Sequence, residues 1–400
     1  MLTITLKPGK EKSLLRRHPW VFAAAIARVD GKAAEREKIG ATAIVQSADG
    51  RFLGRATHSP ASQIRARVWT FNEHEPLDHA LIKRRVAAAL AYRREWVRNT
   101  DAIRLIFGEA DGFPGLVVDW YGGQAGHLVC QFQSGGVEAW KPTIVEALVA
   151  QTGCPNVYER SDAAVREREG LPIVTGVLAG AEPPEEIEVV ENGVRYGVNV
   201  RTGHKTGFYV DQRDNRQLVM DHARERDVLN CFCYTGGFSL AAMKGGARSV
   251  ISVDSAGAAL DTARRNVARN GFDTARVEWR DDDVFQLLRA LRAEGRSFDL
   301  IVLDPPKFAS APGQVERAAR AYKDINLIGL QLLRENGLLF TYSCSGAISA
   351  ELFQKIVAGA ATDAKVDARI LRRLSAGVDH PMMTNFPEGE YLKGLMLMRA

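Results

Sequence analysis

Apolar and polar residues alternate over short runs in the first 72 residues of the chain. LTITL, ATAIVQSADGRFLGRATH and QIRARVWTF are rich in β-branched residues, and Asp49-Gly50 supplies a hairpin turn. Alternation of this kind is typical of strands that bury one face. The pattern predicts a small β-rich domain, a barrel or a sandwich, over residues 1–72.

The apolar period changes after Asp78, which can cap a helix. Ile82, Val86 and Leu90 recur at helical spacing, so a helix is predicted over residues 79–98. Beyond it we expect a hairpin in IRLIFGEADGFPGLVVDWY, a strand in HLVCQFQ, one helix in VEAWKPTIVEALVAQ and a strand in NVYERS. These elements predict a second, α+β domain over residues 73–182.

The segment GAEPPEE at 180–186 has the composition of a linker, because it is rich in proline and acid and lacks apolar periodicity. Asn192-Gly193 turns a hairpin after it. From residue 227 onward apolar strands alternate with helical stretches, one of them placed over NLIGLQLLRENG, as far as the strand LLFTYS. This alternation predicts an α/β fold with a parallel sheet covered on both faces, a Rossmann-like domain over residues 183–400.

Composition narrows the class of protein. The 400 residues are 46% hydrophobic and 25% charged, which suits a globular chain with a large core. There is no secretory h-region and no run of about 18 apolar residues, so we expect no membrane segment and a cytoplasmic location. The five cysteines form no C-x-x-C pair, and their odd number favours reduced thiols with no metal site.

The positive charge is concentrated at the N-terminus. Residues 1–72 contain 13 Lys or Arg against 5 Asp or Glu, whereas the whole chain carries a net charge of only +5. Such a block suits contact with phosphates, and a solvated basic surface is the alternative interpretation.

Candidate chemistry follows the predicted strands, because ligands of such sheets bind beyond the carboxyl ends. NCFCYTGGFSLAA is a glycine-containing turn that opens a helix, without the G-x-G-x-x-G of dinucleotide-binding folds. Asp254 ends the next strand, where a carboxylate can accept the hydroxyl hydrogens of a ribose. Asp283, before Val284, can accept from the amine of an adenine or cap a helix. With no phosphate-binding loop, S-adenosylmethionine fits better than ATP or NAD.

The loop LDPPKF at 303–308 is stiffened by two prolines that follow Asp304. Enzymes that methylate amines usually have an aromatic residue directly after such prolines, but here Lys307 stands there and Phe308 comes one later. The next strand end, TYSCSG, carries Cys344, whose thiolate would be a strong nucleophile.

These two residues predict methylation of a cytosine at C5. Addition of the Cys344 thiolate to C6 makes C5 nucleophilic, and Asp304 assists by hydrogen bonding to N3 or protonating it. Three alternatives stay open. They are a methyltransferase acting on a guanine or adenine nitrogen of ribosomal RNA with Cys344 a bystander, an RNA-binding protein with a degenerate domain, and, less favoured, a nicotinamide oxidoreductase.

Together the motifs resemble the bacterial 23S ribosomal RNA cytosine-C5 methyltransferases that carry an N-terminal PUA domain. The resemblance spans the chain through RRHPWVF, GEADGFPGLVVD, TGHKTGFYVDQRDNR, NCFCYTGGFS, LDPPKF, YKDIN, SCSG and PEGEYLKG. It implies a PUA domain, a central α+β domain and a Rossmann-like S-adenosylmethionine-dependent methyltransferase domain. It also implies S-adenosylmethionine as methyl donor and 23S rRNA, free or in a large-subunit assembly intermediate, as substrate.

Site residues are carried over onto matching positions. The resemblance implies Cys344 as nucleophile and Asp304 as its partner, and a homodimer is one option for the oligomeric state. The expected cofactor-binding residues are Lys205, Phe208, Asp211, Gln212, Arg216, Tyr234, Thr235, Gly236, Gly237, Asp254, Asp283, Val284, Asp304 and Pro305. The expected RNA-binding residues are Arg16, Arg17, Lys307 and Phe308, and the expected structural cysteines are Cys130, Cys154, Cys231 and Cys233. Two departures stand out. Many methyltransferases have glycine where this chain has Tyr234, and another group of RNA cytosine-C5 enzymes has a second cysteine where it has Lys307.

Overall fold

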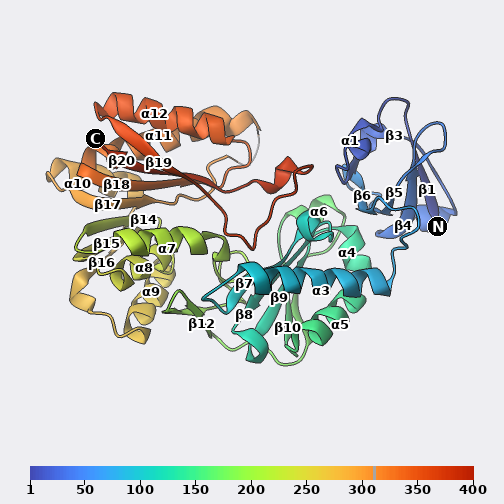
Figure 1. Ribbon diagram of the computed structural model, residues 1–400, viewed down its shortest axis with the longest axis horizontal. Coiled ribbons are helices and arrows are strands. Elements are labelled where there is room, and N and C mark those ends of the chain that lie inside the picture. Colours follow the sequence, from blue (N-terminus) through green and yellow to red (C-terminus); the bar gives the residue numbers. More distant parts are fainter. Residues whose placement is uncertain (310–311) are drawn as a thin grey trace. The chain divides into compact units, whose positions relative to one another are not determined.

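The computed structural model describes residues 1–309 and 312–400, and the chain divides into two compact units (Figure 1). The first unit comprises Met1–Val190, Val198–Val210 and Val378–Gly389. The second comprises Glu191–Gly197, Asp211–Gly377 and Glu390–Ala400. The chain therefore passes between the units several times. The division into three domains at 72/73 and 182/183 stays a prediction.

The first unit begins with a six-stranded sheet in the order β2-β6-β5-β4-β1-β3. Its strands are β1 (Leu2–Leu6), β2 (Trp20–Phe22), β3 (Ile26–Asp30), β4 (Ala41–Gln46), β5 (Phe52–His58) and β6 (Ile64–Thr70), with the short helices α1 (Lys12–Leu15) and α2 (Ala33–Glu37). Strands β4 and β5 form the hairpin predicted around Asp49-Gly50, where Gly50 has φ of 84°. The β-rich character of this region is confirmed.

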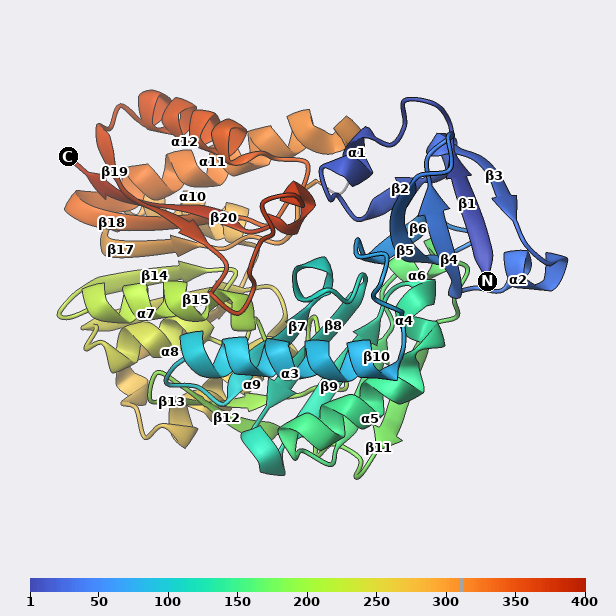
Figure 2. The same cartoon turned by 45° about the vertical axis from the view of Figure 1, so that its right-hand side comes forward.

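A long helix, α3 (His79–Trp96), follows the first sheet (Figure 2). The Asp78 side chain accepts a hydrogen bond from the Leu81 backbone N–H at 2.9 Å, which confirms the predicted N-cap. Beyond it, five strands pair in the order β11-β10-β9-β8-β7. They are β7 (Ala102–Phe107), β8 (Leu116–Tyr121), β9 (His127–Phe132), β10 (Val157–Ser161) and β11 (Val174–Ala179).

The helix expected over VEAWKPTIVEALVAQ is wrong in one respect, because the structure has two helices there. They are α4 (Gly135–Ala139) and α5 (Lys141–Thr152), and Trp140 lies between them. Pro142 has no backbone N–H to donate, so it is accommodated in the first turn of a new helix and not in the interior of a continuous one. One more short helix, α6 (Val165–Arg168), precedes β11.

The hairpin predicted at Asn192-Gly193 is formed by β12 (Ile187–Glu191) and β13 (Val194–Val198). The second unit contains a seven-stranded sheet in the order β16-β15-β14-β17-β18-β20-β19. Its strands are β14 (Asp227–Cys231), β15 (Ser249–Asp254), β16 (Val277–Asp281), β17 (Phe298–Leu303), β18 (Leu333–Ser343), β19 (Ala368–Ser375) and β20 (Lys393–Arg399). The first five strands in this order are parallel, as predicted, and β20 and β19 are antiparallel.

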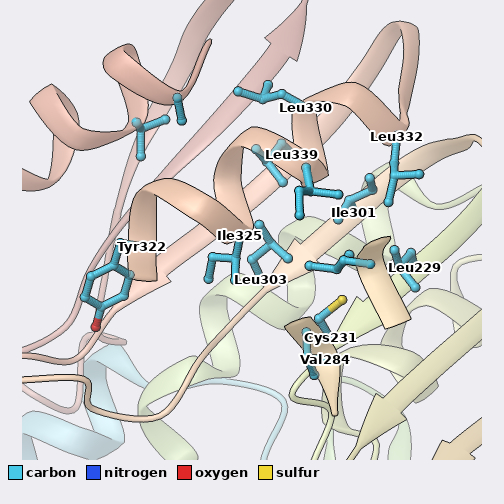
Figure 3. Packing of buried hydrophobic residues seen from close by; sticks show 14 of the residues in the cluster. Leu229, Cys231, Val284, Ile301, Leu303, Tyr322, Ile325, Leu330, Leu332 and Leu339 are labelled. Carbon is cyan, nitrogen blue, oxygen red and sulfur yellow. The ribbon is translucent and has the colours of Figure 1, made fainter. Parts of the chain in front are cut away.

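Helices cover both faces of this sheet. Each face has its own apolar cluster, in which side chains of the helices pack against side chains of the strands. The helices are α7 (Arg213–His222), α8 (Gly237–Lys244), α9 (Gly257–Arg269), α10 (Val284–Ala293), α11 (Val315–Leu332) and α12 (Ala350–Ala364). On one face Tyr322 and Ile325 of α11 share a cluster with Leu229 and Leu339 (Figure 3). On the other, residues of α7 and α8 share a cluster with Val302 and other strand residues.

The C-terminal part of the sheet differs from the expected pattern. The helix predicted over NLIGLQLLRENG ends at Leu332. The remaining residues of that segment, from Leu333 on, belong to β18, because Leu333 already has the extended backbone of a strand. The sequence pattern predicted no helix or strand after Cys344, whereas the structure has α12, β19 and β20 there. Strand β20 lies beside β18 and so brings Lys393 opposite Ser343.

Candidate functional site

The carboxyl ends of the five parallel strands of the second unit meet at one edge of its sheet. In the register of the sheet Cys231 of β14 pairs with Leu303 of β17, and Leu303 pairs with Thr341 of β18. The loops that follow these strands therefore start side by side. Because chain order reverses between β14 and β17, this edge is where a ligand of a doubly wound sheet is expected.

The turn after β14 has an unusual backbone. Phe232, Tyr234 and Gly236 all have left-handed φ values, of 60°, 49° and 83°. A residue with a side chain pays about 1–2 kcal/mol for this conformation, whereas glycine does not. This explains why glycine suits the position that Tyr234 occupies here. At Gly236 an added Cβ would lie 2.8 Å from a methyl carbon of Leu240, so this glycine is required by space as well.

Asp254 holds this turn from the end of β15. Its Oδ2 accepts a hydrogen bond from the Tyr234 backbone N–H at 2.7 Å, and its Oδ1 accepts one from the Ala256 N–H at 3.0 Å. Each carboxylate oxygen has a second lone pair, so the group retains the capacity to accept from a ligand hydroxyl. Thr235 and Gly237 are the remaining turn residues of the predicted set. They directly follow Tyr234 and Gly236 in the chain.

Asp283 is the N-cap of α10, since its side chain accepts from the Gln286 backbone N–H at 2.9 Å. The sequence left open whether Asp283 caps a helix or binds a ligand, and in the structure its side chain caps α10. Val284, the first residue of α10, is buried in the core. Its predicted contact with an adenine stays a prediction.

Asp304, the first residue after β17, is held by side chains of the segment 211–216. Gln212 donates from Nε2 to Asp304 Oδ2 at 3.0 Å, and Asn215 donates from Nδ2 to Gln212 Oε1 at 2.6 Å. Asn215 also donates to the Ser375 carbonyl at the end of β19. Gln212, expected at the cofactor, therefore contacts the predicted catalytic carboxyl.

Arg216 and Asp211 also have protein partners. The Arg216 guanidinium donates through Nε and Nη2 to the two carboxylate oxygens of Glu191, at 2.6 and 2.7 Å. Burial lowers the pKa of Arg216, but the surrounding groups, Glu191 first among them, together raise it above its usual value, so the guanidinium stays charged. Asp211 accepts a hydrogen bond from the Tyr391 hydroxyl at 2.6 Å. Both residues lie in the second unit, as Asp304 does.

Cys344 follows β18 and is half-buried. Its Sγ lies 3.9 Å from the backbone oxygen of Pro305 and donates a hydrogen bond to it. The structure thus brings the thiol to the loop that begins with Asp304, as the order of the strands predicts.

The other four cysteines are buried, and burial raises the pKa of each thiol. They are Cys130, Cys154, Cys231 and Cys233. A thiol with a raised pKa forms little thiolate at neutral pH and is a poor nucleophile. Cys344 is therefore the cysteine best placed to react.

The two remaining residues of the loop differ in exposure. Lys307 is exposed, whereas Phe308 is half-buried. The Phe308 ring lies 4.8 Å from the Tyr322 ring and 6.0 Å from the Phe285 ring, between centroids. The Phe232 ring lies 6.5 Å away as well, so the predicted contact of Phe308 with RNA would involve a ring that already has three aromatic neighbours.

Four predicted site residues lie in the first unit. The Lys205 Nζ lies 4.4 Å from the centre of the Tyr209 ring, and Phe208 is buried. Arg16 and Arg17 are both exposed, and the Arg17 guanidinium lies 5.7 Å from the centre of the Phe71 ring. Their contacts with cofactor or RNA stay predictions.

Lys393 and Tyr342 are among the buried residues near Asp304 and Cys344 that the predicted set lacks. Lys393 at the start of β20 is 6% exposed, and it donates to the carbonyls of Ser345 and Ile348. Burial and, next, the Asp304 charge raise the pKa of Tyr342. The sequence signals for Lys393 were its place in the motif PEGEYLKG and inside the apolar stretch YLKGLMLM, and nothing marked Tyr342.

Two further findings concern the part of the chain that the structure describes. Within residues 1–309 and 312–400, no group of three or more His, Cys, Asp or Glu side chains could hold a metal ion. Over the same residues, no helix is long and apolar enough to cross a membrane.

Comparison with known proteins finds two family matches. Residues 112–379 match the family described as S-adenosylmethionine-dependent methyltransferase, and residues 4–71 match the family described as PUA-like domain. A curated protein of Shewanella amazonensis named ribosomal RNA large subunit methyltransferase I is 50% identical over 99% of this chain and 98% of its own. One of the same name from Cronobacter sakazakii is 47% identical over 98% of each chain.

The fold also has a match among solved structures. SMU.776, described as a putative methyltransferase complexed with SAH, superposes over 100% of both chains with a TM-score of 0.85 and 24% identity. A putative SAM-dependent methyltransferase from Streptococcus mutans covers 100% of both chains with a TM-score of 0.84, also at 24% identity. At this identity the likeness supports the fold alone.

Proposed function

This chain belongs to the family of S-adenosylmethionine-dependent methyltransferases that includes ribosomal RNA large subunit methyltransferase I, and we propose that it methylates C5 of a cytosine in large-subunit ribosomal RNA. The names of the relatives support the substrate class. One observation supports C5, and not a ring nitrogen, as the methyl acceptor. The half-buried thiol of Cys344 lies 3.9 Å from the backbone oxygen of Pro305, in the loop that begins with Asp304.

The residues at the strand ends fit S-adenosylmethionine. Asp254 has lone pairs for the ribose hydroxyls, and the left-handed turn from Phe232 to Gly236 leaves no room for a side chain at its last residue. We assign the turn, Asp254, Asp283 and Val284 to the nucleoside. When bound, S-adenosylmethionine supplies an electrophilic methyl group on a positively charged sulfur.

In the proposed mechanism Cys344 acts first. Its thiolate adds to C6 of the cytosine, a C–S bond forms, and the electron pair of the C5=C6 bond moves towards C5. The carboxyl group of Asp304 hydrogen-bonds to or protonates N3 and so stabilises the charge that develops on the ring. Gln212 fixes the plane of that carboxyl group through its 3.0 Å hydrogen bond. C5 is then nucleophilic enough to take the methyl group.

The second half of the reaction restores the aromatic ring. A base, for which we propose water, takes the proton from C5, and the electron pair of that C–H bond re-forms the C5=C6 bond. This expels Cys344 as the thiolate, and a proton that Asp304 has given to N3 returns to Asp304, so the enzyme is ready for another turnover. Lys307 stands where another group of RNA cytosine-C5 enzymes has a second cysteine, so a second thiol plays no part in release.

To enter the space beside Asp304 and Cys344, the target base must be flipped out of its stack or already be single-stranded. We propose that Arg16 and Arg17 of the basic N-terminal region contact phosphates, and that Lys307 does the same near the base. The substrate is free 23S rRNA or an assembly intermediate of the large subunit in the cytoplasm. A homodimer remains the option for the oligomeric state, to be tested by sedimentation.

Nucleoside mass mapping tests the proposal. Large-subunit rRNA from cells lacking this protein is incubated with the enzyme and S-adenosylmethionine, then digested. The wild-type protein and a Cys130→Ala control should form 5-methylcytidine, and Cys344→Ala should form none. Methylated guanosine or adenosine formed equally by Cys344→Ala would establish the alternative, transfer to a ring nitrogen.

A further inference from the structure

Lys393 is a buried lysine whose amine contacts the loop that carries Cys344. It is the first residue of β20 and pairs with Ser343, the residue directly before Cys344. Its Nζ donates to the Ser345 carbonyl at 2.9 Å and to the Ile348 carbonyl at 2.7 Å. These two hydrogen bonds lie on either side of the turn that follows the cysteine. An ammonium group, with three donors and no acceptor, suits such a pair of carbonyls.

The charge of Lys393 has no carboxylate partner within hydrogen-bonding distance among the described residues, and its two acceptors are neutral carbonyls. Lysine is rarely buried without a counter-ion, because desolvation of the ammonium group is costly. Burial accordingly lowers the pKa of Lys393, while the charges of Glu390 and Cys344 raise it and that of Lys307 lowers it. A thiolate on Cys344 would therefore supply the anion that this buried cation lacks.

We propose that Lys393 is a positioning residue for Cys344, which holds the loop after the thiol and favours its thiolate form. The inference rests on the proposed function, in which Cys344 is the nucleophile. Because two charges act on each other equally, a cation stabilised by the Cys344 thiolate must stabilise that thiolate in return.

Other contacts fix the same loop. The Ser345 Oγ accepts a hydrogen bond from the Ala309 backbone N–H at 3.2 Å and shares one with the Tyr322 hydroxyl at 3.0 Å. Tyr322 is a buried phenol, and burial is the main cause that raises its pKa, so it stays neutral beside the thiol. With Tyr322 neutral and Lys307 and Glu390 exposed, Lys393 is a buried cation that acts on Cys344.

Alkylation of the full-length protein by iodoacetamide measures the thiolate directly. The rate is followed across pH by intact-protein mass, and Cys344→Ala gives the background from the four buried cysteines. The test variant is Lys393→Gln, which retains an amide donor for the loop but removes the charge. The matched control is Lys355→Gln, because Lys355 is exposed on α12 and pairs with Glu351.

We expect the alkylation midpoint of Lys393→Gln to rise by about one pH unit, with about a tenfold slower reaction near neutral pH, the lower end of the effect of a nearby opposite charge. The Lys355→Gln profile should match the wild type. The inference is overturned by a folded Lys393→Gln protein with an unchanged alkylation profile.

Lys393→Arg covers the case in which the neutral variant does not fold. It keeps the positive charge, so we expect its alkylation midpoint to stay at the wild-type value. If the alkylation midpoint of Lys393→Arg rose by about one pH unit, as expected for the neutral variant, the positive charge would not be the cause. These measurements use no RNA, so they are separate from the proposed function, which fails instead if Cys344→Ala still forms 5-methylcytidine.

Discussion

The Gln212 side chain donates a hydrogen bond from Nε2 to Oδ2 of Asp304 over 3.0 Å, and its own Oε1 accepts one from Asn215 at 2.6 Å. A residue at the start of α7 thereby orients a carboxyl group 92 positions later in the chain. Orientation of this kind matters in the proposed mechanism, since Asp304 must meet N3 of the target ring in its plane.

Replacing Gln212 with Leu should therefore lower kcat and leave the affinity for S-adenosylmethionine unchanged. A hydrogen bond to a charged group is worth about 1.5–3 kcal/mol, which corresponds to a loss of about 10- to 150-fold in kcat. Steady-state kinetics and calorimetric titration of the cofactor measure the two quantities. Gln217→Leu is the control, because Gln217 lies in α7, the helix that Gln212 precedes, and bonds to Asp221. Weaker cofactor binding with normal kcat would show instead that Gln212 acts at the cofactor.

A second prediction asks whether Arg216 stabilises the fold or binds the cofactor. Because it forms a buried bidentate pair with Glu191, Arg216→Met should destabilise the second unit by about 3–5 kcal/mol. The double variant with Glu191→Leu should recover most of that loss, since no buried charge is left unpaired. Hydrogen exchange of β14 amides in urea reports on this unit. A stable Arg216→Met protein that binds S-adenosylmethionine poorly would contradict the structural role.

The strand ends were predictable from the sequence because one rule, that parallel strands end together, places Asp304 and Cys344 at one edge. The contacts of these two residues were not predictable. Gln212 was expected at the cofactor and instead contacts Asp304, and Lys393 reaches the site through the pairing of β20 with β18, which apolar periodicity does not reveal. Asp283 shows the converse limit, since the same residue type suits a helix cap and a ligand, and local sequence cannot separate them.

The stability of the second unit should depend on pH through Asp227. This carboxylate accepts hydrogen bonds from Arg248, Ser249 and Arg334 at the start of β14, and they lower its pKa, with Arg248 the largest cause. A carboxyl group with a depressed folded-state pKa contributes stability above its unfolded pKa, about 3.9. That stability is lost as pH falls through the folded-state value.

Asp227→Asn should thus be less stable than the wild type at pH 7, and the difference should shrink as pH falls below about 4. Urea unfolding of both proteins across this range measures the difference. A gap between the two proteins that stays constant from pH 7 to strongly acidic solution would refute the assignment.

Arg16 and Arg17 lie on the exposed surface of the first unit, where they are proposed to contact phosphates. Replacing both with Gln should weaken RNA binding and make the dependence of log affinity on log salt less steep by about one to two units. Filter binding at several salt concentrations tests this, with Arg28→Gln as the control because Arg28 already pairs with Asp30. An unchanged salt slope in the double variant would remove these residues from the RNA-binding surface.

Covalent trapping tests most directly whether Cys344 attacks the target cytosine. In RNA substituted with 5-fluorocytidine, fluorine replaces the hydrogen that must leave C5, so the enzyme should remain attached to the ring after methyl transfer. Mass spectrometry of the digested complex should then find the methylated, fluorinated base on Cys344, in wild-type protein and in Cys130→Ala alike. Full methyl transfer to the natural RNA with no such adduct would contradict the covalent mechanism and move the methyl acceptor from carbon to nitrogen.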